Sequence, residues 1–516
     1  MSKRFYITTA IAYPNGKPHM GHAYEAIATD VIARFKRLDG HHVRFLTGTD
    51  EHGLKIDRAA RAAGLPPKDY VDTMVAPFQT LDDMLGVSYD RFIRTTDQDH
   101  KALVQALWQR MAANGDLYLD RYEGWYSVRD EAYYDSSELV EATDASGATV
   151  QLSPQGTPVE WTVEESWFFR LSAYQDRLLA HYDSHSEFIQ PSTRFNEMRA
   201  FVAGGLSDLS VSRTSFTWGI AVPGDSHPSN NAHVMYVWLD ALANYLTGAD
   251  TSGQGSLDGD WWPAGLHVVG KDVMRFHTVY WPAFLMSAGL ALPKTVFGHG
   301  FLLNRGEKMS KSLGNVVDPA AMAEKFGVDR LRWFLCRDVA FGDDGSYSDE
   351  AIIERTNADL ANGIGNLAQR ALAMVAKNLG GQMPAPAPDA DLDTALATAE
   401  AAYMSAMNAL QLHKALEAVM AMVTAANGYF AENAPWSLAK TDPAAMARVL
   451  GTTLDATRRI VLLVQPFIPA SADKLLTLLG VATDLRDFNA LHMEVPTGTQ
   501  LPAPEGVFPR IAADKP

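Results

Sequence analysis

Cysteine is almost absent from this chain: Cys336 is the only one in 516 residues. A disulfide framework or a zinc site built from several thiolates needs more, so both are excluded within the chain. A secretory signal is also missing, because Lys3 and Arg4 precede only a short strand-like apolar run. No uncharged apolar run reaches about 18 residues, so we expect no membrane span and a cytoplasmic location.

An excess of basic charge is lacking too. The chain has 44 Lys and Arg against 61 Asp and Glu, a net charge of −17 at pH 7. Non-specific nucleic-acid binding relies on a basic face, and this balance argues against it. Any polyanionic partner must therefore be held by a few well-placed groups that work against a repulsive background field.

The first hundred residues alternate between strand and helix patterns. A β-branched and aromatic run at 5–11 indicates a strand, and the apolar residues of 23–38 recur near helical spacing. A second strand is indicated at 43–48. Two strands joined through a helix form a βαβ unit, in which the strands pair in parallel.

A similar alternation returns later, with a strand expected at 266–270, a helix at 273–288 and a strand at 295–303. Beyond residue 350 the strand signal fades. Long Ala-, Leu- and Met-rich stretches with helical spacing follow at 351–378, 391–431, 443–464 and 470–479. They indicate a helical bundle. The tail from Pro496 is rich in Pro and Gly and is expected to be loosely ordered.

These patterns predict an α/β fold with an added helical domain. We expect a Rossmann-like, doubly wound parallel sheet that is interrupted by a connective insertion and followed by an all-α helical bundle. The predicted parts are the first half of the Rossmann domain, the insertion, the second half and the helical domain, at 1–115, 116–225, 226–350 and 351–516.

The turn after the first strand carries His19 and His22 on either side of Gly21. Ligands of open parallel sheets bind beyond the carboxyl ends of the strands, and a helix N-terminus there favours phosphate. Gly21 would let a flat ring or a phosphate approach the backbone. The two imidazoles, one helical turn apart, could donate hydrogen bonds to phosphate oxygens. Two surface histidines on a loop are the alternative.

A second candidate phosphate site lies near residue 310, where Lys308 and Lys311 flank Met-Ser. Lysine is a point charge on a flexible stem and binds phosphate well. Such a loop could close over a pyrophosphate leaving group and stabilise charge that develops in the transition state. By itself Lys-x-x-Lys is common, and most copies belong to solvated surface.

Taken together, the two elements resemble the two signatures of class I aminoacyl-tRNA synthetases. From residue 4 to beyond 470 the chain is similar to the methionyl family of these enzymes. The matching motifs, which follow one another in order, are Ala-Tyr-Pro-Asn-Gly-Lys-Pro-His-Met-Gly-His (12–22), Thr-Gly-Thr-Asp-Glu-His-Gly (47–53), Tyr-Val-Trp-Leu-Asp-Ala-Leu (236–242), Val-Gly-Lys-Asp (269–272) and Lys-Met-Ser-Lys-Ser (308–312).

The resemblance implies a reaction in two steps. The carboxylate of L-methionine attacks the α-phosphorus of ATP, which carries Mg²⁺, and pyrophosphate leaves. A terminal ribose hydroxyl of an initiator or elongator methionine tRNA then attacks the methionyl adenylate, and AMP leaves. No protein nucleophile is needed, and catalysis consists of placement and charge stabilisation. His19, His22, Lys308 and Lys311 would supply the charge.

The methionine site is expected to combine a carboxylate with an apolar pocket. Asp50, at the end of the second strand, could pair with the substrate ammonium or cap the next helix; the resemblance favours the ammonium. Trp238 and Tyr245 lie seven apart on a helix, a spacing more often found in a core, although a thioether favours aromatic contact. By resemblance, the pocket residues are Ile11, Tyr13, Trp238, Ala241, Leu242, Tyr245 and His277, with the Tyr13 hydroxyl and the His277 ring near the sulfur. Some members of the family carry Pro at the position of Leu242.

The nucleotide would also contact the segment around Gly270 and Asp272, with Asp272 on a ribose hydroxyl; an ordinary turn and helix cap is the alternative. His299, on the strand before the lysine loop, is either a nucleotide contact or a buried structural histidine. The full set of ATP residues by resemblance is His19, Gly21, His22, Gly270, Asp272, His299, Lys308 and Lys311.

The helical domain offers a third site. Asn366 and Arg370 are four apart on one helix face, and Trp436 could stack an unpaired base. A solvated helix face and a bundle plug are the alternatives. By resemblance all three residues read a CAU anticodon, which makes 351–516 the anticodon-binding domain.

Two features depart from the family pattern. Many methionyl enzymes carry cysteine zinc knuckles in the insertion, which this chain cannot, so we expect no structural zinc. The C-terminal oligonucleotide-binding domain that makes some relatives dimeric is also missing, and we expect a monomer. The competing interpretations are a synthetase for another amino acid, a nucleotidyltransferase without tRNA, and a non-catalytic tRNA-binding protein.

Overall fold

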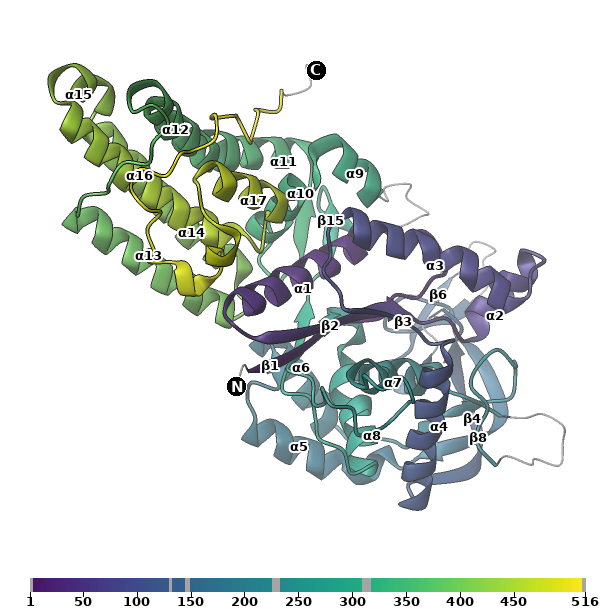
Figure 1. Cartoon of the computed structure of the whole chain (residues 1–516). Helices are drawn as coiled ribbons and strands as arrows, with labels where there is room; N and C mark the ends of the chain where they lie inside the picture. Colours follow the sequence, from purple (N-terminus) through teal and green to yellow (C-terminus); the bar gives the residue numbers. More distant parts are fainter. Residues whose placement is uncertain (1–2, 130–131, 144–148, 225–232, 309–316, 513–516) are drawn as a thin grey trace.

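The structure, a computed structural model, describes residues 3–129, 132–143, 149–224, 233–308 and 317–512 (Figure 1). Within them, six parallel strands form a central sheet in the order β3–β2–β1–β13–β14–β9. Their bounds are β1 (Arg4–Thr9), β2 (His42–Thr49), β3 (Arg91–Arg94), β9 (Ile189–Gln190), β13 (Leu266–Gly270) and β14 (Val296–His299). The predicted Rossmann-like parallel sheet is confirmed.

The βαβ unit at the start of the chain is confirmed as well. Helix α1 (Met20–Leu38) connects β1 to β2, and the two strands pair in parallel with Ile7 opposite Phe45. Successive residues of each strand enter different cores: Ile7 and Phe45 pack with α1, whereas Tyr6 and Leu46 pack on the other face. Both faces of the sheet are therefore covered, as the near-continuous apolar runs require.

Helices cover the two faces of the sheet from different parts of the chain. Figure 1 shows α1 on one face, and α4, α7 and α8 on the other. The helices of the two Rossmann halves are α2 (Leu54–Ala62), α3 (Pro67–Met84), α4 (Gln98–Ala113), α7 (Val237–Ala249), α8 (Trp281–Ser287), α9 (Pro319–Phe326) and α10 (Val328–Asp338). The helix expected at 273–288 consists of a 3₁₀ turn at Lys271–Val273, a π-helical turn at Phe276–Tyr280 and then α8.

The prediction of a single strand at 295–303 is wrong. The segment is split into β14 and β15 (Leu302–Asn304), and β15 pairs with β16 (Glu307–Lys308) and β17 (Gly345–Tyr347) in a separate small sheet. The break falls at Gly300, where a Cβ atom would lie 2.2 Å from the backbone of Asp343. The backbone of the 338–348 segment therefore approaches too closely for any other residue there.

The connective range contains an antiparallel sheet, β10–β8–β4–β5, and a hairpin, β6–β7. The bounds are β4 (Leu117–Ser127), β5 (Ala132–Tyr134), β6 (Val140–Thr143), β7 (Thr149–Leu152), β8 (Glu160–Phe169), β10 (Leu209–Ser210) and β11 (Ser212–Arg213), with helices α5 (Gln175–Ser184) and α6 (Ser192–Ala203). Strand β11 pairs with β12 (Val234–Met235), which follows the predicted insertion. Strand β9 also lies in this range, yet it pairs with β14 at the edge of the central sheet.

The helical bundle is confirmed. It contains α11 (Asp349–Thr356), a π-helical stretch at Asn357–Gly365, α12 (Asn366–Asn378), α13 (Ala390–Asn408), α14 (Leu412–Glu432), α15 (Pro435–Thr441), α16 (Pro443–Val464) and α17 (Pro469–Leu478). The stretch expected at 391–431 is broken at Leu410, whose φ of +57° ends the helical path. The bundle shares one apolar core with α1 and α10, so it is packed onto the Rossmann domain.

The tail as far as residue 512 is not loosely ordered, contrary to expectation. Leu501 and Phe508 are buried against the bundle, and Ile511 exchanges two hydrogen bonds of 2.9 Å with the side chain of Asn357. Apolar anchors spaced along a Pro-rich segment hold it without a helix or strand. None of the helices in the described ranges is long and apolar enough to cross a membrane.

Candidate functional site

The two histidines expected to contact the nucleotide, His19 and His22, form the cap of α1. His19 is the N-cap residue, and its Nδ1 accepts a hydrogen bond of 3.1 Å from the backbone N–H of Gly21. The Nδ1 of His22 accepts one of 3.1 Å from the backbone N–H of His19. The two rings lie side by side with their centroids 3.9 Å apart. The sequence motif thus places both imidazoles at one helix N-terminus, where the helix dipole favours an anion.

This cap determines which ring nitrogen carries the proton when either imidazole is neutral. A ring nitrogen that accepts a hydrogen bond carries no proton, so in the neutral imidazole the proton sits on Nε2. Burial and the neighbouring His19 ring hold the pKa of His22 well below its ordinary value. Gly21 has a local role here, because a Cβ atom at this position would lie 2.9 Å from the His19 ring. His22 therefore presents a neutral N–H donor rather than a fixed positive charge.

His299 is buried and paired with a residue that the sequence did not single out, Glu25 of α1. Nδ1 of His299 donates to the carbonyl of Gly300 at 2.8 Å, and Nε2 lies 2.8 Å from Glu25 Oε2. Burial raises the pKa of Glu25. Burial by itself would lower the pKa of His299, but the contact with the Glu25 carboxylate outweighs it, so the pKa of His299 is raised as well. The two groups hold one proton between them. Glu25 follows His22 by three residues, and that helical spacing was the available signal.

The second nucleotide segment follows β13. Asp272 is exposed, and its carboxylate lies so near Gly270 that a Cβ there would come within 2.6 Å of it. Lys271 is paired with Asp344 at 2.7 Å, which ties this turn to the segment before β17. The backbone of Lys308 belongs to β16; its side chain and the whole of Lys311 lie outside the described residues.

Asp50 and the segment around Tyr13 are joined at the carboxyl ends of β1 and β2. The N–H of Ala12 donates to the carbonyl of Gly48, and the N–H of Asp50 donates to the carbonyl of Ala12, both at 2.9 Å. The Tyr13 hydroxyl donates to the carbonyl of His52 at 3.2 Å. Adjacent parallel strands therefore place the expected ammonium partner beside the start of the nucleotide turn.

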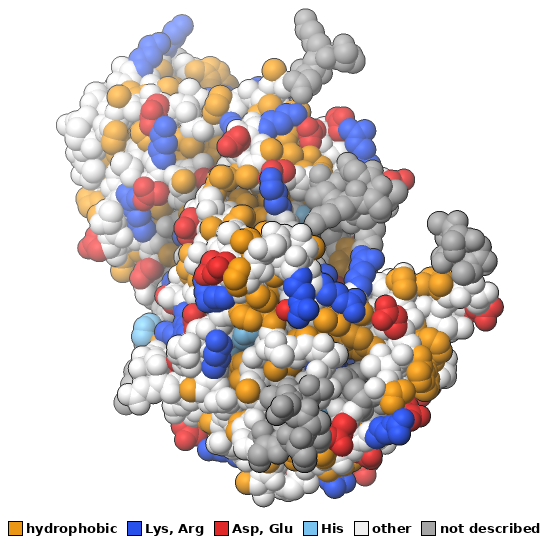
Figure 2. All heavy atoms as spheres, turned by 90° about the vertical axis from the view of Figure 1, so that its right-hand side faces the viewer, with side chains coloured by type: hydrophobic (Ala, Val, Ile, Leu, Met, Phe, Trp, Pro, Cys, Tyr) orange, Lys and Arg blue, Asp and Glu red, His pale blue; other side chains and the backbone are white. Residues whose placement is uncertain are grey.

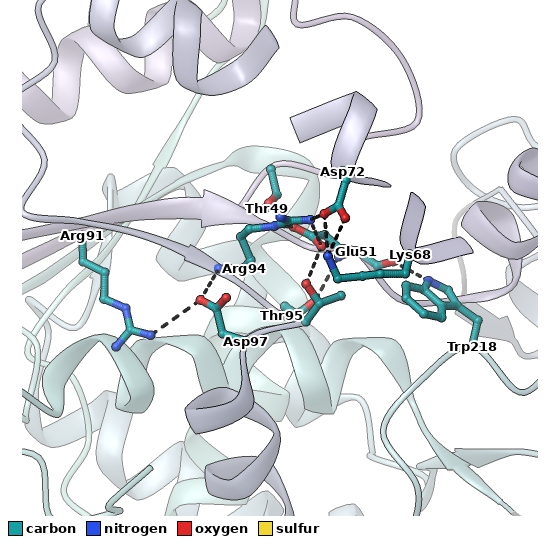
Figure 3. Close-up of polar contacts among 10 residues, drawn as sticks. Thr49, Glu51, Lys68, Asp72, Arg91, Arg94, Thr95, Asp97 and Trp218 are labelled. Carbon is teal, nitrogen blue, oxygen red and sulfur yellow. Dashed lines mark hydrogen bonds and ion pairs between the residues drawn. The ribbon is translucent and has the colours of Figure 1, made fainter. Parts of the chain in front are cut away.

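The loop of Asp50 is anchored through its neighbour Glu51, a residue that was not predicted (Figure 3). The buried Glu51 carboxylate accepts two hydrogen bonds from Arg94 of β3, at 2.6 and 2.8 Å. Arg94 also contacts Asp72 of α3 at 2.6 Å, and Lys68 pairs with Asp72. A bidentate charged pair of this kind holds planar geometry firmly, so the loop is fixed relative to β3 and α3.

The expected pocket residues of α7 lie together. Leu242 and Tyr245 belong to the core on this face of the sheet, and Ile11, Tyr13 and Trp238 are half-buried against the same core. Ala241 is also buried. Aromatic rings and aliphatic carbon are what a thioether side chain prefers as neighbours.

Two aromatic contacts define this region further. Trp238 stacks on Phe276, which was not predicted, with centroids 3.7 Å apart and planes at 6°. Nδ1 of His277 donates to the carbonyl of Val273 at 2.9 Å, so its Nε2 accepts the 2.6 Å hydrogen bond from the Tyr245 hydroxyl. Burial lowers the pKa of His277 to about 4. His277 is therefore neutral, and both of its ring nitrogens are used within the protein.

The expected base-reading residues lie on one part of the bundle. Arg370 of α12 places its guanidinium 4.7 Å from the ring of Phe430 and 5.5 Å from the ring of Trp436. Trp436 is 46% exposed, although most large apolar side chains of the bundle are buried. Asn366 precedes Arg370 by one helical turn at the start of α12. A cation stacked on an accessible indole is a suitable platform for an unpaired base.

A basic area is visible on a chain whose net charge is −17. Figure 2 shows Lys and Arg side chains across the middle of one face, the side on which α2 and α3 lie in Figure 1. The exposed basic residues of these helices include Arg58, Arg61 and Lys68. Arg61 and Lys68 each pair with an aspartate of their own helix, which reduces the local charge.

Among the described residues, no group of three or more His, Cys, Asp or Glu side chains could hold a metal ion.

Comparison with known proteins identifies the family. Residues 5–372 match the family of class I tRNA synthetases (M), and residues 380–516 match the anticodon-binding domain of methionyl tRNA ligase. The methionine–tRNA ligase of Mesorhizobium japonicum is 56% identical over 515 residues, covering 98% of this chain and 98% of the relative. That of Mycobacterium tuberculosis, strain CDC 1551, is 56% identical over 525 residues, covering 100% and 99%.

Solved structures agree with this assignment. The methionyl-tRNA synthetase of M. tuberculosis in complex with methionyl-adenylate is 55% identical, with a TM-score of 0.93, covering 98% of this chain and 100% of that one. Its apo form gives a TM-score of 0.85 at 51% identity, covering 99% of each chain. The resemblance seen in the motifs is confirmed. This chain therefore belongs to the methionyl family of class I tRNA synthetases, the ATP-dependent ligases that join methionine to tRNA.

Proposed function

We propose that this chain ligates L-methionine to initiator and elongator methionine tRNAs through a methionyl adenylate. The observation that carries the proposal is the junction of β1 and β2. There the segment that leads from β1 into the α1 cap begins beside the Asp50 loop, because the N–H of Asp50 donates a hydrogen bond of 2.9 Å to the carbonyl of Ala12. The turn that carries the two histidines and the carboxylate expected to hold the ammonium group therefore start from neighbouring strand ends.

The nucleotide half of the proposed site uses His19, Gly21, His22, Gly270, Asp272, His299, Lys308 and Lys311 to hold ATP and its Mg²⁺. An oxygen of the methionine carboxylate forms a bond to the α-phosphorus, and the bond from that phosphorus to the bridging oxygen of pyrophosphate breaks. Neutral Nε2–H donors at the end of α1 and the two lysines stabilise the charge that moves onto the phosphates. Pyrophosphate leaves with the magnesium.

The amino-acid half uses Asp50 for the ammonium group. Ile11, Tyr13, Trp238, Ala241, Leu242, Tyr245 and His277 line the side-chain pocket. His277 is held neutral, so it adds polarisable ring surface without a charge that an apolar thioether would have to desolvate. The hydroxyl of Tyr13, which donates to the carbonyl of His52, is the second polar group proposed near the sulfur.

For the second step, we propose that a ribose hydroxyl at the end of tRNA attacks the adenylate carbonyl and displaces AMP. Asn366, Arg370 and Trp436 read a CAU anticodon on the helical domain. Arg370 stacked near Trp436 supports this role, because single-stranded bases are bound by stacking and by hydrogen bonds to their edges. We also propose that the protein is cytoplasmic and monomeric and contains no structural zinc.

Aminoacylation of two tRNA transcripts tests the proposal. A methionine tRNA with the CAU anticodon should accept methionine, and the same transcript with a changed anticodon should react at least about 100-fold more slowly, as expected when several base contacts of about 1–3 kcal/mol each are lost. Equal charging of both would refute the anticodon assignment. Zinc analysis and sedimentation of the same preparation test the metal and monomer proposals directly.

A further inference from the structure

A buried carboxylate connects the loop of Asp50 to the helix of the pocket. Asp240 of α7 is 1% exposed, and its Oδ2 lies 2.6 Å from Nδ1 of His52, the second residue after Asp50. Its Oδ1 lies 2.7 Å from Nε2 of His100 in α4. His52 and His100 are buried too. Three titratable groups from three separate segments therefore meet in a place that the proposed chemistry does not use.

The carboxylate is ionised and fully engaged. Burial works against its charge, but the two histidines outweigh burial and lower the pKa of Asp240 to about 2. Each oxygen of the carboxylate faces one imidazole nitrogen. A buried charge is kept only where its partners compensate the loss of solvation, so this cluster has one well-defined arrangement.

His100, the third member of the cluster, makes a second contact with helix α7. Nδ1 of His100 lies 3.0 Å from the Thr247 hydroxyl, two helical turns after Asp240 on α7. His100 thus contacts α7 at two points, Asp240 and Thr247. The other partner of Asp240 is His52, in the loop that follows β2.

Several contacts hold that loop, and two of them have different consequences. Glu51 is bound by Arg94, which fixes the loop to β3 and α3 (Figure 3). His52 is bound by Asp240, which fixes the loop to α7. Asp240 is adjacent to Ala241 and two residues from Trp238, so the second anchor connects the expected ammonium partner to the expected side-chain pocket.

A site that holds both ends of a flexible substrate measures its length. The ammonium group of methionine and its thioether are separated by a fixed number of bonds, and a site with both ends rigid gains most from the substrate that fits. One methylene more or less in such a site typically changes kcat/KM by about 10–200-fold. If the two ends could move relative to one another, part of that discrimination would be lost.

We propose that Asp240 is a positioning residue that holds the Asp50 loop at a set distance from the methionine pocket and so determines which side-chain length the enzyme accepts. The inference rests on the proposed methionine site and goes beyond it. Asp240 itself does not touch the substrate; it acts through His52.

The test is Asp240→Asn, which keeps the shape of the side chain and removes its charge. An amide can accept from only one of the two histidines, and it carries no charge, so the contact with His52 is either lost or no longer charge-assisted. We expect KM for methionine in pyrophosphate exchange to rise about 10-fold or more while KM for ATP stays within about twofold, since only interactions with the amino acid are lost. The preference in kcat/KM for methionine over S-methylcysteine, one methylene shorter, should fall about 10-fold.

Glu400→Gln is the matched control. Glu400 is also buried, at 6% exposed against 1% for Asp240, and it pairs with Arg459 at 2.6 Å in the helical bundle, away from the sheet. This variant should lose stability but keep both KM values and the length preference. A similar change in both variants would mean that Asp240 acts only through general stability and would overturn the proposal.

The remaining outcomes are also decisive. An Asp240→Asn protein that is folded and has an unchanged KM for methionine and an unchanged length preference would overturn the proposal. If Asp240→Asn does not fold, His52→Gln breaks the same contact from the loop side, and the same two quantities decide. Failure of the unmodified protein to show methionine-dependent exchange would instead refute the proposed function.

Discussion

His19 and His22 are linked through the backbone of α1: the N–H of His19 donates to Nδ1 of His22, while Nδ1 of His19 accepts from the N–H of Gly21. A capping box usually uses hydroxyl or carboxylate side chains. Here imidazoles do the same work, and the arrangement leaves the proton of each neutral ring on Nε2. Helix capping and the orientation of the proposed catalytic donors are therefore one structural feature.

Two substitutions at His19 separate these roles. His19→Ala removes both the cap and the donor, so adenylate formation should fall about 10²–10³-fold and the free energy of unfolding by about 1 kcal/mol. Asparagine is a good N-cap residue, so His19→Asn should recover the stability but not the rate. Urea unfolding and pyrophosphate exchange measure the two effects. Recovery of the rate by His19→Asn would show that the ring is needed only as a cap.

His277 makes stability depend on pH. Its pKa is about 4 in the folded protein because of burial, against about 6.5 in the unfolded chain. Between these two pH values the unfolded state binds more protons than the folded state does. The contribution of His277 to the free energy of unfolding is therefore intact above about pH 6.5 and is lost as the pH falls toward 4. We expect His277→Gln to lose less stability between pH 7 and pH 5 than the unmodified protein does. The measurement is urea unfolding of both proteins at pH 7 and pH 5. If the variant and the unmodified protein lost the same free energy of unfolding between these pH values, a buried, neutral His277 would be contradicted. His22 and His267, whose pKa values are also lowered by burial, keep part of the slope in both proteins.

Lys311 is expected to act in the transition state. Lys311→Ala should lower the rate of adenylate formation about 10²–10³-fold, as loss of one donor to developing charge typically does. Methionine binding, measured at equilibrium without ATP, should hardly change. If binding and rate fell equally, the lysine would be contributing to ground-state structure instead.

Trp436 is expected to act only on tRNA. Loss of a stacking platform costs about 1–3 kcal/mol per base, so Trp436→Ala should reduce kcat/KM for tRNA by about 10–100-fold. Pyrophosphate exchange without tRNA should be unaffected, because Trp436 lies on the helical domain at the start of α15. Loss of exchange as well would indicate misfolding rather than a role in recognition.

Local sequence patterns predicted what depends on neighbouring residues. Strand β13 has the bounds 266–270 that its apolar run indicated, and the turn with His19 and His22 does cap a helix. The break between β14 and β15 was missed, because it depends on the close approach of Asp343, more than forty residues away in the sequence.

The anchors of the site were missed for the same reason. His52 and Asp240 are 188 residues apart in the chain, and a sequence without a fold gives no sign that they meet. The contact between Glu51 and Arg94 is similar: only the neighbouring Asp50 was interpreted from the sequence, as a ligand or a cap, and the pairing of β2 with β3 is what brings Arg94 to Glu51. Motifs identified the residues that would meet the substrates, whereas the residues that position them required the tertiary structure.

The most direct test of the account is amino-acid-dependent ATP–pyrophosphate exchange by the purified protein without tRNA, measured with each of the twenty amino acids. We predict exchange with methionine, and with any other amino acid a rate at least about 10-fold lower, the smallest discrimination expected for a one-methylene difference. Equally rapid exchange with a different amino acid would contradict the pocket around Trp238 and Tyr245, and no exchange from the folded protein would contradict the adenylate chemistry itself.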